Sequence, residues 1–157
     1  YYAGQFAGVV KIDQSEALKY KLVAAEAGYA LAQHDVAGHY GRMGNSEEAI
    51  KWLKMAVDQG DSMALQSLAS AYYQGKEVPK DLSLAYAYFK LSVLASEKTI
   101  RAAAQTVLGD MAAKMSKPEL EKAEKLVSEW KPQPTALTLK AMSGFKAAEA
   151  HLKNAKN

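Results

Sequence analysis

The sequence repeats itself, and this repetition limits the possible folds more than any other feature of the chain. Residues 15–28 align with residues 46–60 at an offset of 32, and residues 82–96 follow at a further 36. The equivalent positions are Ala17, Ala49 and Ala85; Tyr20, Trp52 and Tyr88; Ala24, Ala56 and Ser92; and Gly28, Gly60 and Ser96. A period of about 20–50 residues is typical of repeat proteins, whose units bury apolar faces only by stacking on their neighbours.

The segments between these copies repeat as well, at the same offset of 32. The equivalent pairs are Ala32 and Ala64, Val36 and Leu68, Ala37 and Ala69, and Tyr40 and Tyr72. Apolar residues in both sets recur every three or four positions, which indicates helices. We therefore expect antiparallel helix pairs, with helices over residues 14–27, 30–41, 46–58, 62–74, 82–95, 98–115, 117–130 and 136–153.

Residues that begin and end helices flank these ranges. Three pairs have the spacing of a capping box: Asp13 with Glu16, Asn45 with Glu48, and Ser116 with Glu119. Asp81 and Ser96 are predicted to cap helices alone. Gly28 and Gly60 stand where two helices should stop, and we expect both to take the left-handed conformation that ends many helices.

Small residues predict close packing between these helices. Alanine occupies ten repeat positions: 17, 24, 25, 32, 37, 49, 56, 64, 69 and 85. Short side chains allow helix axes to approach toward the lower end of the usual distance of about 8–10 Å. Tyr20, Trp52 and Tyr88 share one repeat position, and we expect all three to fill the core opposite the alanines.

The repeat fades after Ser96, which divides the chain into three parts. Residues 1–96 form the repeats, and residues 97–130 are expected to be a helical cap that shields the last repeat. Residues 131–157 begin with Lys-Pro-Gln-Pro, which predicts an extended link, and continue as a basic helix. The apolar residues of this helix, Leu137, Leu139, Met142 and Phe145, could pack on the repeats or on a partner, and we expect the former.

Charge and composition narrow the class of protein. Residues 131–157 carry five Lys and one Glu, so the other 130 residues carry 15 basic and 16 acidic side chains. A nucleic-acid-binding protein should have a basic stripe through its folded body, and this body is neutral. The chain lacks Cys, which excludes disulfides and thiolate metal sites, and no apolar run predicts a membrane span.

The first residue lies in the middle of a repeat unit. Tyr1 is equivalent to Tyr72 of the segment Ala71–Asp81, so we expect a trimmed or processed product.

The repeat residues resemble those of a known family. Asp13, Ala17, Tyr20, Ala24 and Gly28 fit the pattern D-x-x-x-A-x-x-W-x-x-x-A-A-x-x-G with Tyr for Trp, and Val10 and Val78 fit its preceding loop. The chain is thereby similar to the Sel1-like repeat (SLR) family of bacterial type, although residues 41–48 form a shortened loop without the Val and Asp. The resemblance implies an all-α, right-handed α-solenoid of about two and a half units. It also implies a protein-binding module that is not an enzyme, with the periplasm or cell envelope favoured over the cytoplasm.

The sequence offers no pattern that indicates a catalytic, cofactor or metal site. The three histidines are His34, His39 and His151, and the first two lie five residues apart, where their side chains diverge by about 140° on a helix. That spacing does not match the i, i+4 pair of a helical metal site. The glycine-rich segment at residues 4–8 lacks the Lys and Ser/Thr of a phosphate-binding loop. We therefore expect no catalytic residue, metal or cofactor.

What remains is a binding surface on the first helix of each pair. These helices usually line the concave side of a solenoid, which is its recognition surface. The predicted partner-binding residues are His34, Asp35, Gly38, Arg42, Met63, Gln66, Ser67, Ser70, Tyr73 and Gln74. We expect an adaptor or scaffold, monomeric alone, that binds a protein of unknown identity through this face.

Two alternatives stay open. Bacterial relatives include proteins that neutralise secreted toxin enzymes, so an immunity protein against an enzyme such as a lipase is the second hypothesis. A hydrolase is the third, and it would predict turnover that depends on His34. The adaptor and the immunity protein differ in their partners: an adaptor should have several weaker ones, and an immunity protein should have one that it binds very tightly.

Overall fold

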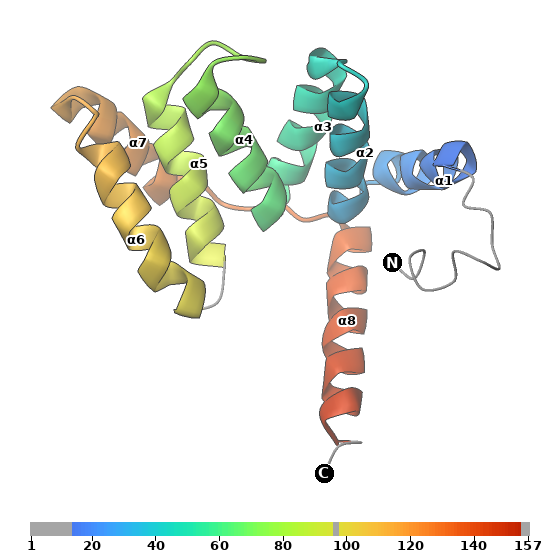
Figure 1. Ribbon diagram of the computed structural model, residues 1–157. Coiled ribbons are helices and arrows are strands. Elements are labelled where there is room, and N and C mark those ends of the chain that lie inside the picture. Colours follow the sequence, from blue (N-terminus) through green and yellow to red (C-terminus); the bar gives the residue numbers. More distant parts are fainter. Residues whose placement is uncertain (1–13, 96–97, 155–157) are drawn as a thin grey trace.

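The computed structural model describes residues 14–95 and 98–154, with side chains over 16–95 and 104–148. Eight helices make up these ranges: α1 (Gln14–Glu26), α2 (Ala30–Arg42), α3 (Ser46–Asp58), α4 (Ser62–Gln74), α5 (Leu82–Ala95), α6 (Lys98–Ala112), α7 (Lys117–Glu129) and α8 (Ala136–Asn154). Each predicted helix is confirmed to within three residues at its ends. Figure 1 shows α2–α5 following one another across the array, with α6 and α7 against α5 at its far end and α8 projecting away from the α2 end. The predicted α-solenoid is therefore confirmed.

Short polar side chains begin several of these helices, as the sequence predicts. Asn45 and Asp81 each accept a hydrogen bond from the backbone N–H three residues later, at 3.2 and 2.9 Å. The backbone N–H of Ser116 donates to the Glu119 carboxylate at 2.8 Å. Asp61 caps α4 in the same way, at 2.8 Å, although the sequence analysis did not identify it. The predicted caps at Asp13 and Ser96, with the whole segment 1–13, lie outside the described residues.

Gly28 and Gly60 end helices in the left-handed conformation, with φ of +92° and +86°. Both glycines also lie against the extended link that follows α7. A Cβ atom on Gly60 would be 2.8 Å from Pro132 Cβ, and one on Gly28 would be 2.9 Å from Thr135 Cγ2. The link therefore passes directly beneath the ends of α1 and α3, so these positions require glycine for two reasons.

The main core lies between α2, α3, α4 and α5. Its most buried residues include Val36, Ala56, Leu65 and Leu68, each with 0% exposure. Most of the repeat alanines are buried there, as predicted, because small side chains let the helices approach closely. Trp52 is also buried, with 8% of its surface exposed.

Two predictions about the first repeat are wrong. Tyr20, at the position equivalent to Trp52, is 70% exposed, and Ala17 is exposed as well. The physical reason is a difference in neighbours. Tyr88, the third equivalent residue, stacks on Tyr72 of α4, whereas α1 packs mainly on α2 among the described helices. No described helix covers the face of α1 that carries Tyr20.

The helices α6 and α7 close the other end of the row. They pack on α5 around a second cluster of buried residues, which comprises Tyr86, Ala87, Leu108 and Ala123. An ion pair reinforces this contact, because Lys90 Nζ of α5 lies 2.6 Å from Glu124 Oε1 of α7. The apolar face of α5 is thereby shielded from water on the side away from α4.

The last helix does not behave as expected. The prediction that its apolar residues pack on the repeats is wrong, because the exposed fractions are 39% for Leu137, 53% for Leu139, 51% for Met142 and 62% for Phe145. Among the described side chains of α8, Thr138 near its beginning is the buried one, with 5% of its surface exposed. Attachment at one end explains why the rest of α8 extends away from the array in Figure 1.

Among the described residues, no helix combines the length and the apolar character that crossing a membrane requires.

Candidate functional site

Two hollows lie on the face formed by α2, α4 and α6, one on each side of α4. The first has a volume of about 260 Å³ and lies between α2 and α4, over α3. The second has a volume of about 770 Å³ and lies between α4 and α6, beside α5. Ser67 and Ser70 of α4 line both hollows, so the two form one continuous surface across this helix. We call the two hollows together the α4 groove.

Small residues create the first hollow. Ala37, Gly38 and Gly41 on α2 face Ala71 on α4, and none of them carries a side chain long enough to fill the space between the helices. Apolar side chains of α3 form the floor, namely Ala49, Ile50 and Leu53. The repeat pattern explains this shape, because small residues are needed where neighbouring helices approach.

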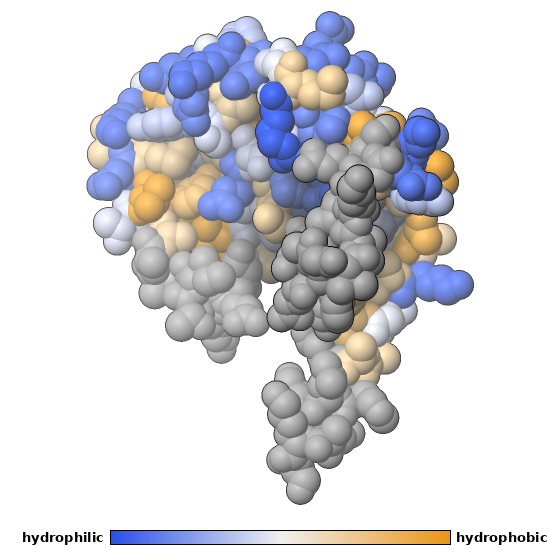
Figure 2. Space-filling view, turned by 45° about the vertical axis from the view of Figure 1, so that its right-hand side comes forward, coloured by the Kyte–Doolittle hydropathy of each residue, from blue (hydrophilic) through white to orange (hydrophobic). Residues whose placement is uncertain are grey.

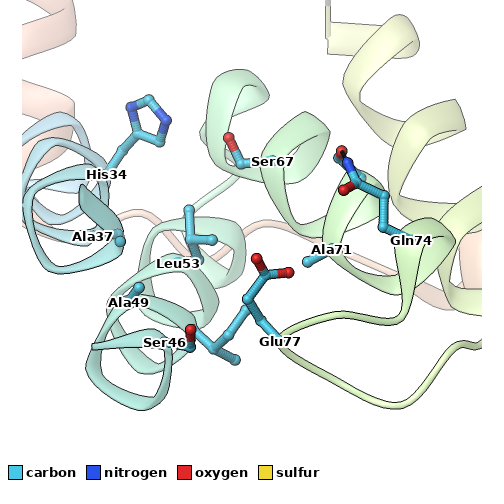
Figure 3. Close-up of a pocket in the computed structure, with 13 residues that line it drawn as sticks. His34, Ala37, Ser46, Ala49, Leu53, Ser67, Ala71, Gln74 and Glu77 are labelled. Atoms are coloured by element: carbon cyan, nitrogen blue, oxygen red, sulfur yellow. Dashed lines mark hydrogen bonds between the residues drawn. The ribbon is translucent and has the colours of Figure 1, made fainter. Parts of the chain in front are cut away.

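Polar groups surround this apolar floor (Figure 3). His34 extends from α2, Ser67 faces it from α4, and the Glu77 side chain reaches into the hollow from the segment after α4. Gln74 Nε2 donates to Ser70 Oγ at 2.8 Å, which uses part of their hydrogen-bonding capacity.

Two of these groups keep unused hydrogen-bonding capacity. The Nδ1 atom of His34 is buried without a hydrogen-bond partner. No described residue forms a hydrogen bond or ion pair with Glu77. A buried polar atom without a partner is costly, so a group that supplies the missing hydrogen bond would be stabilised here.

The second hollow is larger and more aromatic. Tyr73 forms one wall, and Phe89, Val107 and Met111 contribute apolar surface from α5 and α6. Lys114 Nζ lies 3.2 Å from the Tyr73 hydroxyl and 5.9 Å from the centre of its ring, within the range of a cation–π interaction. Lys114 thereby contacts both the hydroxyl and the face of the half-exposed Tyr73 ring.

The α4 groove includes seven of the ten predicted partner-binding residues. They are His34, Gly38, Gln66, Ser67, Ser70, Tyr73 and Gln74. Asp35 lies outside it and pairs with Lys21 at 2.8 Å. Arg42 and Met63 do not line either hollow, although a Cβ atom on Gly38 would be 3.5 Å from Arg42 Nη1. That these residues bind a partner stays a prediction.

Sequence reasoning missed the contribution of the cap and of the loop after α4. Val107, Asp110, Met111 and Lys114 of α6 and the following turn line the second hollow, and Glu77 lines the first. The repeat pattern ends before α6, so no repeat-equivalent position indicated these residues. The equivalence of α6 with α2 and α4 becomes visible only in the packed structure.

The titratable side chains of the described residues were compared with the requirements of a metal site. Among them, no group of three or more His, Asp or Glu side chains is placed to hold a metal ion. His34 and Glu77 line the same hollow, but no hydrogen bond joins them. The groove combines an apolar floor with hydrogen-bonding groups at its rim, which is the usual anatomy of a surface that recognises another molecule.

Comparison with known proteins identifies the repeat. The Sel1 repeat family model matches the sequence three times, over residues 1–29, 30–61 and 62–95. No curated protein matches it. Among solved structures, similarity was found to a protective antigen present in uropathogenic Escherichia coli strains that displays an SLR fold, with 20% identity and a TM-score of 0.47. That match covers 82% of this chain and 35% of the antigen chain, so this chain spans about a third of the antigen's length.

Proposed function

This chain belongs to the Sel1 repeat family, whose members are protein–protein interaction modules, and we propose that it is an adaptor that holds a protein partner in the α4 groove. The observation that carries this proposal is the pair of hollows that meet at Ser67 and Ser70. A segment of a partner that crosses α4 would place side chains in both hollows at once. Neither hollow requires a rearrangement of the array to be reached.

The two hollows favour different parts of such a partner. The second, with Tyr73 and Phe89, suits a bulky apolar side chain, because aromatic surfaces supply much of the binding energy at interfaces. The first suits a polar or basic group, because Glu77 and the His34 Nδ1 atom are both without partners. Apolar burial would supply affinity, and the polar rim would supply specificity.

A bulky substitution at the shared edge of the hollows tests this function. Ser70→Arg would place a bulky, charged side chain at the edge that both hollows share, whereas Ser128→Arg places the same change at an exposed position of α7, outside them. Each variant and the parent chain would be used to capture proteins from the native cells, with quantitative mass spectrometry as the readout. We expect the parent and Ser128→Arg to capture the same proteins, and Ser70→Arg to lose them at least tenfold. Equal capture by Ser70→Arg would contradict the assignment.

A further inference from the structure

The α8 helix stands free of the array along most of its length. Beyond Thr138, most of its described side chains are exposed, and Phe145 is 62% exposed. Figure 2 shows the described part of α8 extending below the array, with apolar side chains at its surface. A helix that exposes Leu, Met and Phe side chains to water is expected to have something to bury them against.

The exposed residues of α8 are arranged in an amphipathic pattern. At about 100° of rotation per residue, Leu137, Ala141, Met142, Phe145 and Ala148 fall within an arc of about 140°, which also contains the positions of Thr138 and Glu149. Leu139 lies outside this arc.

Two lysines border the apolar arc. Lys146 lies about 110° from the centre of the arc on one side, and Lys140 lies about 130° from it on the other. The apolar stripe is therefore flanked on both sides by positive charge.

The positive charge of the chain is concentrated in this part of the sequence. Residues 131–157 carry five Lys and one Glu, a net charge of +4, while residues 1–130 carry a net charge of −1. A binding surface for α8 should therefore be negatively charged as well as apolar. An anionic bilayer has both properties, because the apolar stripe can be buried among the acyl chains while the long lysine side chains on its flanks bend toward the negative headgroups.

We propose that α8 binds the surface of an anionic phospholipid bilayer. The helix lies parallel to the surface, with Leu137, Met142 and Phe145 among the acyl chains. Lys140 and Lys146 contact the negative headgroups on either side. Interfacial helices of this kind combine a basic polar face with Leu and Phe on the other, and basic residues add to binding roughly independently. The projecting helix thereby presents the repeat array, with its α4 groove, at a membrane surface.

The charge pattern argues against a second copy of the chain as the occupant. Two α8 helices packed against each other would bring Lys140 and Lys146 of each copy close to those of the other. Like charges repel across such a contact, whereas an anionic bilayer neutralises them.

Vesicle sedimentation with the full chain tests the proposal. The vesicles would be phosphatidylcholine alone, or equal parts of phosphatidylcholine and phosphatidylglycerol, at low salt. We expect binding to the anionic vesicles only. The variant Lys140→Gln/Lys146→Gln should lower the partition coefficient roughly twenty-five-fold, at about fivefold per lysine. Phe145→Glu should abolish binding. Phe145→Trp should show a blue shift of tryptophan emission on vesicle binding that exceeds any shift of the parent chain, which contains Trp52 and Trp130.

A charge-matched variant supplies the control. Lys117→Gln/Lys125→Gln removes the same charge from α7, where these side chains are 89% and 73% exposed. It should bind the anionic vesicles almost as well as the parent chain, and so should Ser70→Arg, because neither change touches α8. The proposal is overturned if the parent chain ignores anionic vesicles, or if the α7 variant loses as much binding as the α8 variant. An α8-dependent dimer in light scattering, without vesicle binding, would identify a second copy as the occupant instead.

Discussion

The side chains of Gln59 and Thr138, which are 79 residues apart in the sequence, are joined by a 2.7 Å hydrogen bond from Thr138 Oγ1 to Gln59 Oε1. Gln59 Nε2 in turn donates to Gly28 O and to Gln33 Oε1, both at 2.9 Å. Gln33 is 2% exposed and Thr138 5% exposed, so this network lies in the interior. It connects the end of α1, the first turn of α2, the end of α3 and the first turn of α8, and it determines where α8 leaves the array.

Thr138→Val should loosen the start of α8. The substitution keeps the shape of the side chain but removes the hydroxyl that donates to Gln59 and accepts from the Ala30 N–H at 3.1 Å. Leaving these buried groups without a partner should lower the free energy of unfolding by about 1–3 kcal/mol. Hydrogen exchange over residues 135–148 should become faster. Ser143→Ala, on the exposed part of the same helix, should leave both quantities unchanged; equal effects of the two substitutions would show that the network does not hold α8.

Gly60→Ala should destabilise the protein more than Gly44→Ala. Both glycines have positive φ, so each substitution carries a backbone cost of roughly 1–2 kcal/mol. A Cβ atom on Gly44 would meet nothing within 4 Å, whereas one on Gly60 would be 2.8 Å from Pro132 Cβ. The difference between their urea unfolding free energies therefore measures the contact with the link. If the two variants lose the same unfolding free energy, the link can move away from residue 60 without lowering stability.

Trp52→Ala and Tyr20→Ala change equivalent repeat positions but should have different effects. Trp52 is 8% exposed, and its truncation should cost about 3–5 kcal/mol of unfolding free energy. Tyr20 is 70% exposed, so Tyr20→Ala should change stability by no more than about 0.5 kcal/mol. Chemical denaturation of both variants measures this contrast. A large loss in Tyr20→Ala would show that its aromatic ring is buried in solution.

The ion pair between α5 and α7 should make stability depend on pH in the acid range. The hydrogen bond from Lys90 is the main reason that the pKa of Glu124 lies below its usual value, with the Tyr86 hydroxyl adding to the effect. A carboxylate whose folded-state pKa is lowered stabilises the protein above its unfolded pKa of about 4.3. This contribution is lost as the pH falls through the lower, folded-state pKa.

Urea unfolding between about pH 3 and pH 7 measures this dependence. Because Glu124→Gln removes the titrating group, its stability should fall less steeply than that of the parent chain below about pH 4.3. Glu129→Gln affects an exposed pair with Lys125, in which the two groups are 3.8 Å apart, and should keep the parent profile. If the unfolding free energy of Glu124→Gln depends on pH in the same way as that of the parent chain, the ion pair is not the cause of the acid dependence.

Local signals were sufficient to predict the helices and most of their ends. Asn45 and Gly60 act on the backbone within three residues of themselves, so their effect is visible in the sequence. The burial of Trp52 also follows from the repeat, because units of the same sequence pack in the same way. Tyr20 shows the limit of that reasoning, because burial depends on a neighbouring helix and not on the residue itself.

The link and the last helix could not be predicted in the same way. Nothing in the segment Lys131–Pro134 indicates that it runs beneath Gly60 and toward Gly28, a contact between residues more than 70 positions apart. The α6 residues that line the second hollow could not be predicted for a related reason, because they do not follow the repeat pattern. A contact that occurs in only one place, between segments that share no repeat pattern, produces no periodic signal in the sequence.

The most direct test of partner binding at the α4 groove is site-specific photocrosslinking in the native cells. A photoreactive amino acid would replace Ser70, between the two hollows, and in a separate experiment Ser128, on the exposed surface of α7. The proposed function predicts covalent adducts with a protein partner from position 70 and none from position 128. Adducts from position 128 alone, or equal adducts from both positions, would contradict the claim that the α4 groove is the recognition surface.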